Sequence, residues 1–471
     1  MSKRKKVALV VSLAAKSVYV HIVTSKGDLI YTAQERFSLN ESSPGWVEYD
    51  TLGIVYTVRS AINTALTYLK LTSDSVKAIS VTGEPFAYLA WDKRTGLALT
   101  PALSVTCFRL KSSFRKFGMS TLNRHISEIT GSRISETSPF LVFDTLMGMV
   151  ESPNKHVVFG GVESWVVSHL TGFKECVIDT SFAQATQCYD SESGKWDSMI
   201  LGHLNLSAGS LPKVIVDSKG AGVTKGFVPL PDDIPIVGFR HKVVAAMSAV
   251  SALQFGDGYL DLSERVGRFY LSVGEERFSN AQPDSVFMFQ NGTKRHVLEK
   301  QLVFPKLPDY VGELSQVLGN IPEFMPGHSE LMMIPYSTRE GVKSLVKGLS
   351  DQTTREDWGK ALVDSISFSV KQFIEGWESE LGIRSRRLFI TGNLAQYDVL
   401  VQTLSNVLQV QLIQGYPFFD EAHGFDAPFS NVLGSPKSKK KGAYFKTTVP
   451  SVDPISNFAT YNQWSQLALT V

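Results

Sequence analysis

The sequence predicts an α/β protein made of two similar domains. The chain opens with three β-rich runs separated by turn residues, and strand and helix patterns then alternate up to about residue 150. The second half begins with three further β-rich runs, which repeats the opening. These six runs cover residues 7–15, 18–23 and 29–37, and then 258–262, 268–273 and 285–290. Such a repeat indicates two copies of one structural unit.

In the first half, the apolar pattern predicts a helix over 51–69, strands over 78–82 and 86–92, helices up to residue 150, and an amphipathic helix over 159–170. The last helix ends at Thr171-Gly172, a common helix stop. A connector rich in proline and glycine occupies residues 209–235, and we place the domain boundary after it, at residue 240.

The second half carries a long helical pattern over 354–381, a buried strand over 387–391 and a helix over 395–408. The strand runs into Gly392-Asn393, and a strand, a glycine turn and a helix in this order are typical of nucleotide sites. Beyond residue 433, the stretch Lys437–Lys441 indicates a mobile basic loop. We therefore expect domains over 1–240 and 241–433, followed by a basic loop and C-terminal tail over 434–471.

Composition excludes several classes of protein. The chain has 471 residues, of which 43% are hydrophobic and 20% charged, so it is too apolar for a disordered protein. Its longest apolar runs are far shorter than the roughly 20 residues that a membrane-spanning helix needs. The formal net charge is only +2, which gives no field that would attract nucleic acid or a membrane surface.

Cysteine usage indicates a reducing compartment. The chain has three cysteines, Cys107, Cys176 and Cys188, an odd number without CxxC spacing, which argues against a disulfide framework and against a zinc site. The basic start Lys3–Lys6, followed by the apolar run 7–15, is compatible with a secretory signal or with a first strand. The β-rich runs that follow favour the strand. We expect an intracellular protein, most simply a cytoplasmic one, and leave the organelle open.

Three segments carry a resemblance to a known family. They read Pro44-Gly45-Trp46-Val47-Glu48-Tyr49-Asp50, then Trp91-Asp92-Lys93-Arg94-Thr95-Gly96, then Phe159-Gly160-Gly161-Val162-Glu163-Ser164-Trp165 continuing to Leu170-Thr171-Gly172. In this order, over roughly residues 7 to 433, they resemble the FGGY carbohydrate kinases, and among these the glycerol kinases. The resemblance implies two actin-like ATPase (ribonuclease H-like) domains flanking a cleft, and ATP-dependent phosphoryl transfer to a polyol or sugar.

Phosphoryl transfer needs a carboxylate base, oxygen ligands for Mg²⁺ and donors for the phosphates. Where the family joins its first two strands by a D-x-G-T-T-S turn, this chain has Ser12 in place of the acid and Ala14 in place of the glycine. Only Lys16 and Ser17 could still contact a phosphate there. At the family's general base, in its G-x-x-G-D-Q segment, stands Lys242, and an ordinary lysine is protonated at neutral pH.

The positions that bind the acceptor in the family are also altered. The acceptor-binding Arg-Glu pair falls on Pro85 and Phe86 by counting back from Trp91-Asp92. Cys107 replaces the aspartate of the W-x-D-x-R segment, and Phe140 replaces an aromatic phenol. We expect an apolar acceptor pocket without the polar groups that hold a polyol.

On the nucleotide side, the family's second phosphate turn, G-T-G, corresponds to Glu264-Arg265-Val266-Gly267. The adenine-side turn corresponds to Thr391-Gly392-Asn393 and keeps one of two glycines. Residual nucleotide contacts would therefore come from Lys16, Ser17, Arg265, Gly267, Gly392 and Asn393. No metal ligand set is intact, and we expect no cofactor.

The cluster Arg240-His241-Lys242 has two interpretations, a cationic patch that binds an anion or a solvated helix start, and we favour the second. Together these positions predict a catalytically inactive FGGY protein that acts as a binding, regulatory or structural subunit for an unidentified protein, or as a homodimer or larger assembly. One alternative is an active, divergent kinase in which Asp144 or Glu84 is the base, with ATP and Mg²⁺ bound. Another is a nucleotide-binding switch without phosphoryl transfer.

Overall fold

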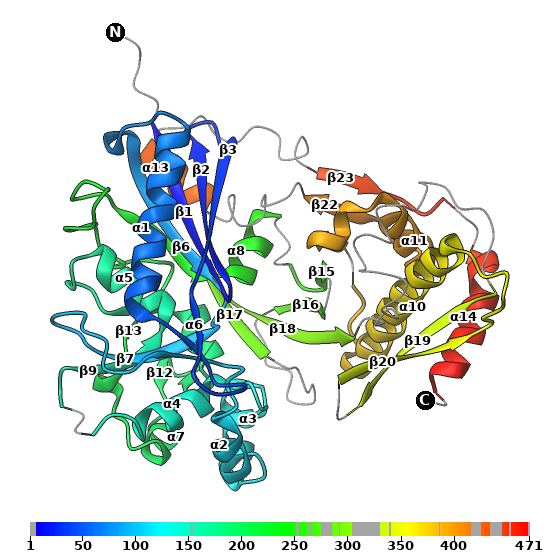
Figure 1. The fold of residues 1–471 in the computed structure, drawn as a ribbon, viewed down its shortest axis with the longest axis horizontal. Helices are drawn as coiled ribbons and strands as arrows, with labels where there is room; N and C mark the ends of the chain where they lie inside the picture. The colour runs from blue at the N-terminus through cyan, green and yellow to red at the C-terminus, as the bar shows by residue number, and fades with distance from the viewer. Residues whose placement is uncertain are drawn as a thin grey trace. The chain divides into compact units, whose positions relative to one another are not determined.

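The computed structural model describes residues 6–151, 154–250, 254–262, 266–274, 285–291, 293–303, 330–338, 341–385, 387–415, 425–433, 445–451 and 454–469. The chain divides into two compact units (Figure 1). The first comprises Met1–Ser251, Glu275–Val297 and Phe418–Ala443, and the second comprises Ala252–Gly274, Leu298–Pro417 and Tyr444–Val471. This grouping is not the same as the predicted divisions at residues 240 and 433: the first unit has segments on both sides of residue 240, and both units have segments on both sides of residue 433.

The main sheet of the first unit has five strands in the order β14-β6-β1-β2-β3. Their bounds are β1 Val7–Ala14, β2 Ser17–Thr24, β3 Leu29–Arg36, β6 Val76–Gly83 and β14 Ile236–His241. The first three strands form the predicted antiparallel meander, and the apolar run that follows the basic N-terminus is the central strand β1. Strand β6 lies parallel to both β1 and β14.

Helices cover both faces of this sheet, which explains why β1 is apolar apart from Ser12. Alternate residues of a strand point to opposite faces. One set, which includes Leu9 and Val11, packs in a cluster with residues of α1 (Thr51–Tyr68) and α5 (Val162–Leu170). The other set, Ala8 and Val10, packs with Ala245 of α8 (Lys242–Ala249) and with α13 (Asp426–Leu433).

A second sheet of the first unit, in the order β4-β5-β8-β7-β9, carries a group of helices. Its strands are β4 Leu39–Glu41, β5 Val47–Tyr49, β7 Ala87–Asp92, β8 Ala102–Ser104 and β9 Val157–Gly161, and the helices are α2 Leu110–Phe117, α3 Thr121–Thr130, α4 Pro139–Met147 and α7 Ser198–His203. The predicted helix over 159–170 was too long, because Phe159-Gly160-Gly161 ends strand β9. Helix α5 is also not amphipathic, since all but one of its residues are buried.

Short elements complete the first unit between α5 and β14. They are β10 Val177–Asp179, α6 Thr180–Ala185, β11 Tyr189–Asp190, β12 Lys195–Trp196 and β13 Lys213–Ile215. Strand β10 pairs in parallel with β13, and α6 packs against β14.

The sheet of the second half runs β17-β18-β16-β15-β21-β22-β23. Its strands are β15 Asp257–Leu262, β16 Val266–Gly274, β17 Ser285–Asn291, β18 Thr293–Val303, β21 Arg387–Thr391, β22 Leu412–Gly415 and β23 Phe445–Thr448. Strand β15 pairs antiparallel with β16 and parallel with β21, as β1 does with β2 and β6. The predicted third strand of this meander, residues 285–290, is instead the edge strand β17, because β18 lies between it and β16.

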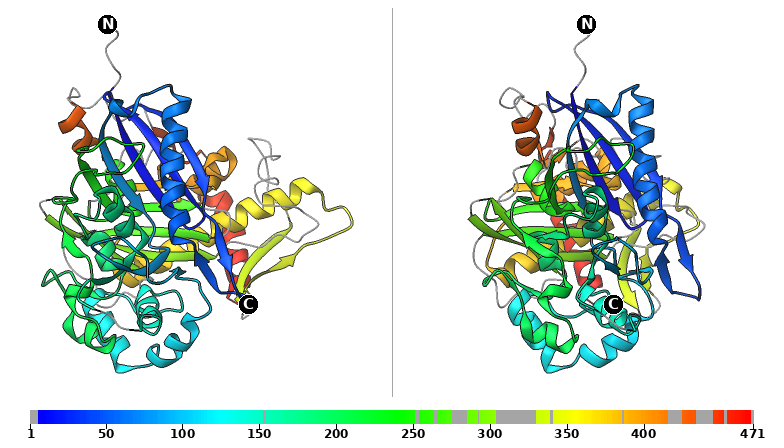
Figure 2. Two further views of the ribbon diagram at one scale, coloured as in Figure 1. Left: turned by 60° about the vertical axis from the view of Figure 1, so that its left-hand side comes forward. Right: turned by 90° about the vertical axis from the view of Figure 1, so that its left-hand side faces the viewer.

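The second unit is completed by helices and a hairpin. These are α10 Arg355–Leu381, α11 Asp398–Leu408, α14 Pro454–Ala468, the 3₁₀ turn Asn393–Gln396, and strands β19 Met332–Thr338 and β20 Gly341–Lys347. Figure 2 shows α10 beside the β19–β20 hairpin, against which it packs. Helix α10 starts with a capping box between Thr354 and Asp357 and ends at Gly382 in the left-handed conformation.

The predicted tail over 434–471 is in part a structural component of the second unit. Strand β23 extends the sheet, and Trp464 of α14 donates a hydrogen bond from Nε1 to the Met333 carbonyl at 2.7 Å. The predicted loop Lys437–Lys441 lies outside the described residues. Across the ranges that the structure describes, no helix combines the length and apolarity needed to cross a membrane.

Candidate active site

The carboxyl ends of the parallel strands β1, β6 and β14 meet at one edge of the first sheet. Ligands of open α/β sheets bind outside the carboxyl ends of the strands, so this edge is the candidate site. Strand β1 brings Ser12, β6 is followed by Glu84, and β14 leads directly into Lys242 at the start of α8. The backbone N–H of Glu84 donates to the Leu13 carbonyl at 3.0 Å, which fixes the end of β6 against β1.

The ammonium group at the predicted base position faces a carboxylate. Lys242 Nζ lies 3.5 Å from Glu84 Oε1, and the two side chains are 28% and 29% exposed. Counting back from Trp91-Asp92 assigned the acceptor-binding pair to Pro85 and Phe86. Glu84, the acid beside Lys242, immediately precedes this pair and is not part of it. The structure brings together the lost base and one of the two carboxylates considered as its replacement.

A buried polar network fixes the backbone just before Lys242. Asp179, the N-cap of α6, accepts hydrogen bonds from the Ser181 backbone N–H at 3.0 Å and from Ser181 Oγ at 2.6 Å. Ser181 Oγ in turn accepts from the His241 backbone N–H at 2.9 Å. Asp179, Ser181 and His241 are all buried. This chain of bonds ties the start of α6 to the end of β14.

Electrostatics in this network depend on burial. Burial raises the pKa of Asp179 to about 6, although the Ser181 hydroxyl and the charge of Arg240 act in the opposite direction. Burial also raises the pKa of Asp217 and lowers that of Arg240, while the negative charges of Asp179 and Asp217 favour the protonated guanidinium. Arg240 is thus a shielded cation near two carboxylates, with the Phe425 ring centroid 5.4 Å from its Cζ.

The prediction of a solvated helix start at Arg240-His241-Lys242 is therefore wrong. His241 is 3% exposed, and its Nδ1 accepts from the Val243 backbone N–H at 3.2 Å as the N-cap of α8. Arg240 is partly buried, and Lys242 contacts Glu84. The edge strand β14 carries these residues inward because it pairs with β6 along its length.

The turn between β1 and β2 is a tight hairpin packed against aromatic rings. Ala14 pairs with Ser17, so the turn consists of Ala15 and the exposed Lys16. The carbonyl of Ala15 accepts from the Tyr49 hydroxyl at 2.6 Å, and that of Lys16 accepts from the Phe37 backbone N–H at 3.0 Å. Burial raises the pKa of Tyr49 to about 12.

The hydroxyl groups of Ser12 and Ser17, on either side of this turn, are buried. Ser12 is 1% exposed within β1, and Ser17 is 4% exposed with its Oγ accepting from Gln34 Nε2 at 3.2 Å. Of the residues predicted to contact a phosphate here, Lys16 alone presents its side chain to solvent.

The predicted acceptor residues pack in two separate apolar clusters. Phe86 is buried, with its ring centroid 5.1 Å from that of Tyr49, in the cluster of the first sheet, while Pro85 before it is partly buried. Cys107 and Phe140 are buried in the cluster formed with the helices α2 to α4. Phe86, Cys107 and Phe140, which were expected to line one acceptor pocket, are therefore core residues in the described structure.

The alternative base Asp144 is already engaged on the helical part of the first unit. Its carboxylate accepts from Ser113 Oγ at 2.6 Å and from Lys116 Nζ at 3.0 Å, both on α2. Of the two carboxylates proposed as a replacement base, Glu84 is thus the one beside Lys242.

In the sheet of the second half, the glycine kept from the family's nucleotide motif has a structural role. Gly392 has a φ of +93°, and a Cβ atom there would lie 2.4 Å from the Leu262 carbonyl oxygen of β15. Asn393 follows as an exposed residue of the 3₁₀ turn. Gly267 is buried in β16, where it pairs with Leu262, and Arg265 lies outside the described residues.

The donors at the first edge do not form a magnesium site. The carboxylate of Glu84 contacts Lys242, and that of Asp179 accepts hydrogen bonds from Ser181. Within the described part of the chain, no three His, Cys, Asp or Glu side chains gather where they could hold a metal ion. The carboxylates described at this edge therefore do not fit the Mg²⁺ that phosphoryl transfer requires.

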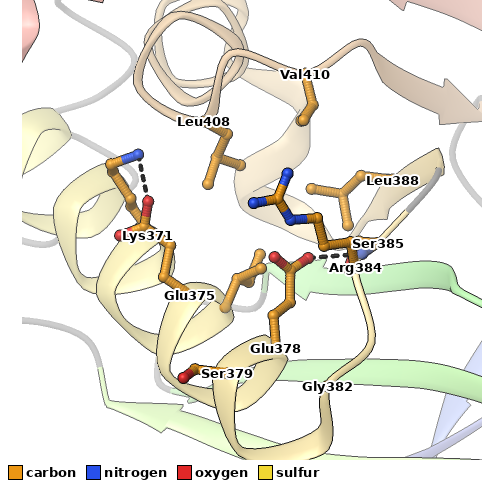
Figure 3. A pocket seen from close by; sticks show the side chains of 11 residues that line it. Lys371, Glu375, Glu378, Ser379, Gly382, Arg384, Ser385, Leu388, Leu408 and Val410 are labelled. Carbon is orange, nitrogen blue, oxygen red and sulfur yellow. Dashed lines mark hydrogen bonds and ion pairs between the residues drawn. The ribbon is translucent and has the colours of Figure 1, made fainter.

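Two pockets lined by described residues lie elsewhere, and none of the predicted site residues lines either. A pocket of about 500 Å³ in the first unit is lined by Asn40, Glu48, Tyr49, Asp50, Thr51, Ala98, Leu99, Thr100 and Pro101. A larger one of about 760 Å³ lies in the second unit, between α10, α11 and the start of β21 (Figure 3).

Sequence reasoning missed Asp179, Ser181 and Asp217. A signal for the first two exists, because Val177-Ile178-Asp179-Thr180-Ser181 places an acid after an apolar strand and before a helix, where N-caps occur. Asp217 follows no such pattern, and its role depends on contacts that only the fold creates.

Comparisons with known proteins agree with the fold. Residues 7–248 match the N-terminal domain of the FGGY family of carbohydrate kinases. A glycerol kinase of Enterococcus faecalis is 27% identical over 412 residues, which cover 82% of this chain and 81% of the relative. Glycerol kinase 1 of Lactiplantibacillus plantarum is 25% identical over 464 residues, which cover 93% of this chain and 92% of the relative.

Solved structures show the same fold at lower identity. A Plasmodium falciparum glycerol kinase with ADP superposes with a TM-score of 0.83 and 16% identity, covering 99% of this chain and 98% of the other. A ligand-bound xylulose kinase from Lactobacillus acidophilus gives a TM-score of 0.78 and 16% identity, covering 99% and 97%. The prediction of two actin-like ATPase domains is confirmed, and the chain belongs to the FGGY family of carbohydrate kinases.

Proposed function

We propose that this chain is an FGGY family protein that does not transfer phosphoryl groups and that acts by binding. The observation that supports the proposal is the contact between Lys242 and Glu84, because it places a cation at the position where the family has its general base. A protonated amine cannot accept a proton from the acceptor hydroxyl. General base catalysis typically contributes about 10²- to 10⁴-fold, so its loss alone would reduce turnover strongly.

Two further features support the proposal. Phosphoryl transfer depends mainly on positioning and on electrostatic stabilisation of the phosphate charge. Ser12 stands buried where the family has an acid, and the carbonyls of the Ala15-Lys16 turn accept bonds from Tyr49 and Phe37. The absence of a cluster of three His, Cys, Asp or Glu side chains among the described residues, and the lack of glycine in the Ala15-Lys16 turn, support the proposal.

A coupled assay of ADP release tests the proposal. The purified chain receives ATP, Mg²⁺ and glycerol, xylulose or gluconate, and the Enterococcus faecalis glycerol kinase serves as the positive control. We expect no release above that of heat-treated protein. Turnover that disappears in Glu84→Gln would contradict the proposal, because a contaminating kinase would be unaffected by that substitution.

A second candidate is an active, divergent carbohydrate kinase in which Glu84 is the base. The names of the relatives favour it, and so does the place of Glu84 directly after β6, at the carboxyl edge of the sheet. In this case Glu84→Gln would abolish turnover while Asp144→Asn would not, since Asp144 accepts bonds from Ser113 and Lys116. The same assay therefore separates the two candidates.

Nucleotide binding without transfer is tested separately. Thermal-shift titration with ATP or ADP, with and without Mg²⁺, would reveal binding as an increase in melting temperature. We expect little or none at millimolar nucleotide; a saturable increase would favour a nucleotide switch. The identity of a protein partner stays a prediction, which affinity capture and mass spectrometry would test, and light scattering would test the predicted homodimer.

A further inference from the structure

The pocket of the second unit has the size and the surface of a small-molecule site. Its volume of about 760 Å³ lies within the roughly 300 to 1,000 Å³ of typical ligand pockets. The second half of α10, the loop Gly382–Ser385, the start of β21 and the end of α11 enclose it. It lies at the amino end of β21, whereas Gly392 follows the carboxyl end. A five-residue strand separates the two by about 16 Å.

One side of the pocket is apolar. Ile374 and Leu388 are buried, while Leu408 and Val410 are partly exposed to the pocket and to solvent. Figure 3 shows Leu408, Val410 and Leu388 grouped around one region of the cavity. Covering partly exposed apolar side chains with a hydrocarbon group is favourable by roughly 25 cal/mol for each Å² removed from water.

Three of the four charged side chains of the pocket already have partners. Lys371 Nζ pairs with Glu375 Oε1 at 2.7 Å, and the other oxygen of Glu375 accepts from the Tyr461 hydroxyl at 3.2 Å. Glu378 Oε1 accepts from the Ser385 backbone N–H at 2.7 Å. These bonds hold the three side chains in place.

Arg384 is the charged side chain that remains. It is exposed, and within the described ranges no ion pair or hydrogen bond of its guanidinium is seen. Figure 3 shows this group lying among Leu388, Leu408 and Val410. A guanidinium presents a planar fork of donors that matches a carboxylate, and here the fork lies beside an apolar surface.

We propose that this pocket binds an organic monocarboxylate with a hydrocarbon body, whose carboxylate pairs with Arg384 and whose chain lies on Leu388, Leu408 and Val410. The lining favours a monoanion, because Arg384 is the charged lining residue without a partner among the described residues. Glu375 and Glu378 would repel a phosphate dianion more strongly than a monocarboxylate, and Arg384 would repel an amine. An uncharged alcohol would leave the Arg384 fork without an acceptor.

Isothermal titration calorimetry on the full chain tests the proposal with sodium octanoate as the probe. Octanol, octylamine and octyl phosphate serve as comparison ligands with the same hydrocarbon chain. We expect saturable octanoate binding at millimolar or lower concentration and at least tenfold weaker binding of the other three, in keeping with a hydrogen-bonded charge pair. Equal binding of octanoate and octanol, or no octanoate binding, would overturn the proposal.

Two substitutions locate the binding. Arg384→Gln should weaken octanoate binding at least tenfold, and Leu408→Ser should weaken octanoate more than the short probe butyrate. Arg355→Gln is the matched control, because it removes the same charge from an exposed position at the start of α10, away from the pocket. Far-UV circular dichroism checks that each variant is folded. Unchanged affinity in folded Arg384→Gln would refute the assignment.

Discussion

The two main sheets place a glycine at the same structural position, and the residues that follow differ. Gly83 ends β6 beside Leu13 of β1, and a Cβ there would lie 2.6 Å from the Leu13 carbonyl oxygen. Gly392 follows β21 beside Leu262 of β15, with the corresponding distance 2.4 Å. Both glycines let a strand end approach the backbone of its parallel neighbour. After the first comes Glu84, which contacts Lys242; after the second comes a 3₁₀ turn in which Asn393 is exposed while Leu394 and Ala395 are buried.

This difference separates residues that the fold requires from residues that catalysis or binding would require. The fold needs both glycines for close approach, so their presence says nothing about nucleotide binding. The residue directly after each glycine, Glu84 or Asn393, is at least partly exposed, so packing constrains it less than it constrains the glycine. Motif residues elsewhere behave like the glycines: Asp50 caps α1 by accepting from two backbone N–H groups, and Gly96 has a φ of +68°.

Gly392→Ala should have the largest effect on stability. Its φ of +93° is unfavourable for alanine by roughly 1 to 3 kcal/mol, and the overlap with the Leu262 carbonyl adds an overpacking cost. We expect a loss of about 3 to 5 kcal/mol in the free energy of unfolding from urea titration. Gly376→Ala in the exposed part of α10 is the control; no atom lies near its Cβ, and alanine should stabilise that helix by about 0.5 to 1 kcal/mol.

Gly83→Ala measures the cost of the steric overlap between two strands without the added cost of a left-handed backbone. Gly83 does not have a positive φ, so only the overlap with Leu13, whose carbonyl oxygen and Cβ would lie 2.6 and 2.9 Å away, opposes the new methyl group. The expected loss is about 1 to 3 kcal/mol in the same titration. A loss equal to that of Gly392→Ala would mean that the left-handed conformation contributes nothing at the second edge.

Asp179→Asn tests the buried network of the first edge through pH. The folded pKa of Asp179, about 6, lies above its usual value of 3.8, so the folded state binds more protons between these pH values. Stability from this group is therefore present below about pH 4 and lost as pH rises to about 6, by at most about 1.4 kcal/mol per pH unit. Asparagine still caps α6 but cannot ionise, so this fall should be absent when unfolding is measured from pH 4 to 7.

Glu163→Gln provides the matched comparison for that experiment. Burial raises the pKa of Glu163 to about 8 from 4.5, so its contribution falls over a window that extends to higher pH. The substitution should flatten the stability profile up to about pH 8, whereas Asp179→Asn should change it only up to about pH 6. Identical profiles for the two variants would contradict the assignment of the lower window to Asp179.

The contact between Glu84 and Lys242 should contribute least to stability. Both side chains are more than a quarter exposed and 3.5 Å apart, and pairs of this kind are typically worth less than about 1 kcal/mol. A double-mutant cycle with Glu84→Gln and Lys242→Met measures the coupling, which should decrease as salt increases. A coupling above about 2 kcal/mol would show a far more shielded pair than the structure indicates.

Much of the fold could be predicted because its signals are local. The meander β1 to β3, the long helix α10 and the strand β21 each show their period within a single segment. Strand β18 was missed because Lys294, Arg295 and His296 interrupt its apolar alternation. The end of β9 was assigned to a helix, since Phe159-Gly160-Gly161 is a short apolar run that periodicity alone cannot classify.

The site was less predictable because its contacts join distant segments. The place of Lys242 at the start of a helix was implied by the resemblance to the family's G-x-x-G-D-Q segment, and the structure agrees. Its contact with Glu84, and the burial of His241 against the network of Asp179 and Ser181, depend on the pairing of β14 with β6. No pattern near residue 242 contains that information.

The C-terminal helix α14 has a practical consequence for handling the protein. Trp464 shares a buried cluster with Ile334, Phe368 and Val407. A chain shortened to end at Leu433 would lack Trp464, and the apolar surface that Trp464 covers would become exposed and promote aggregation during expression. An affinity tag that must be cleaved is therefore better placed at the N-terminus, because unintended proteolysis near the tag then leaves Trp464 in place.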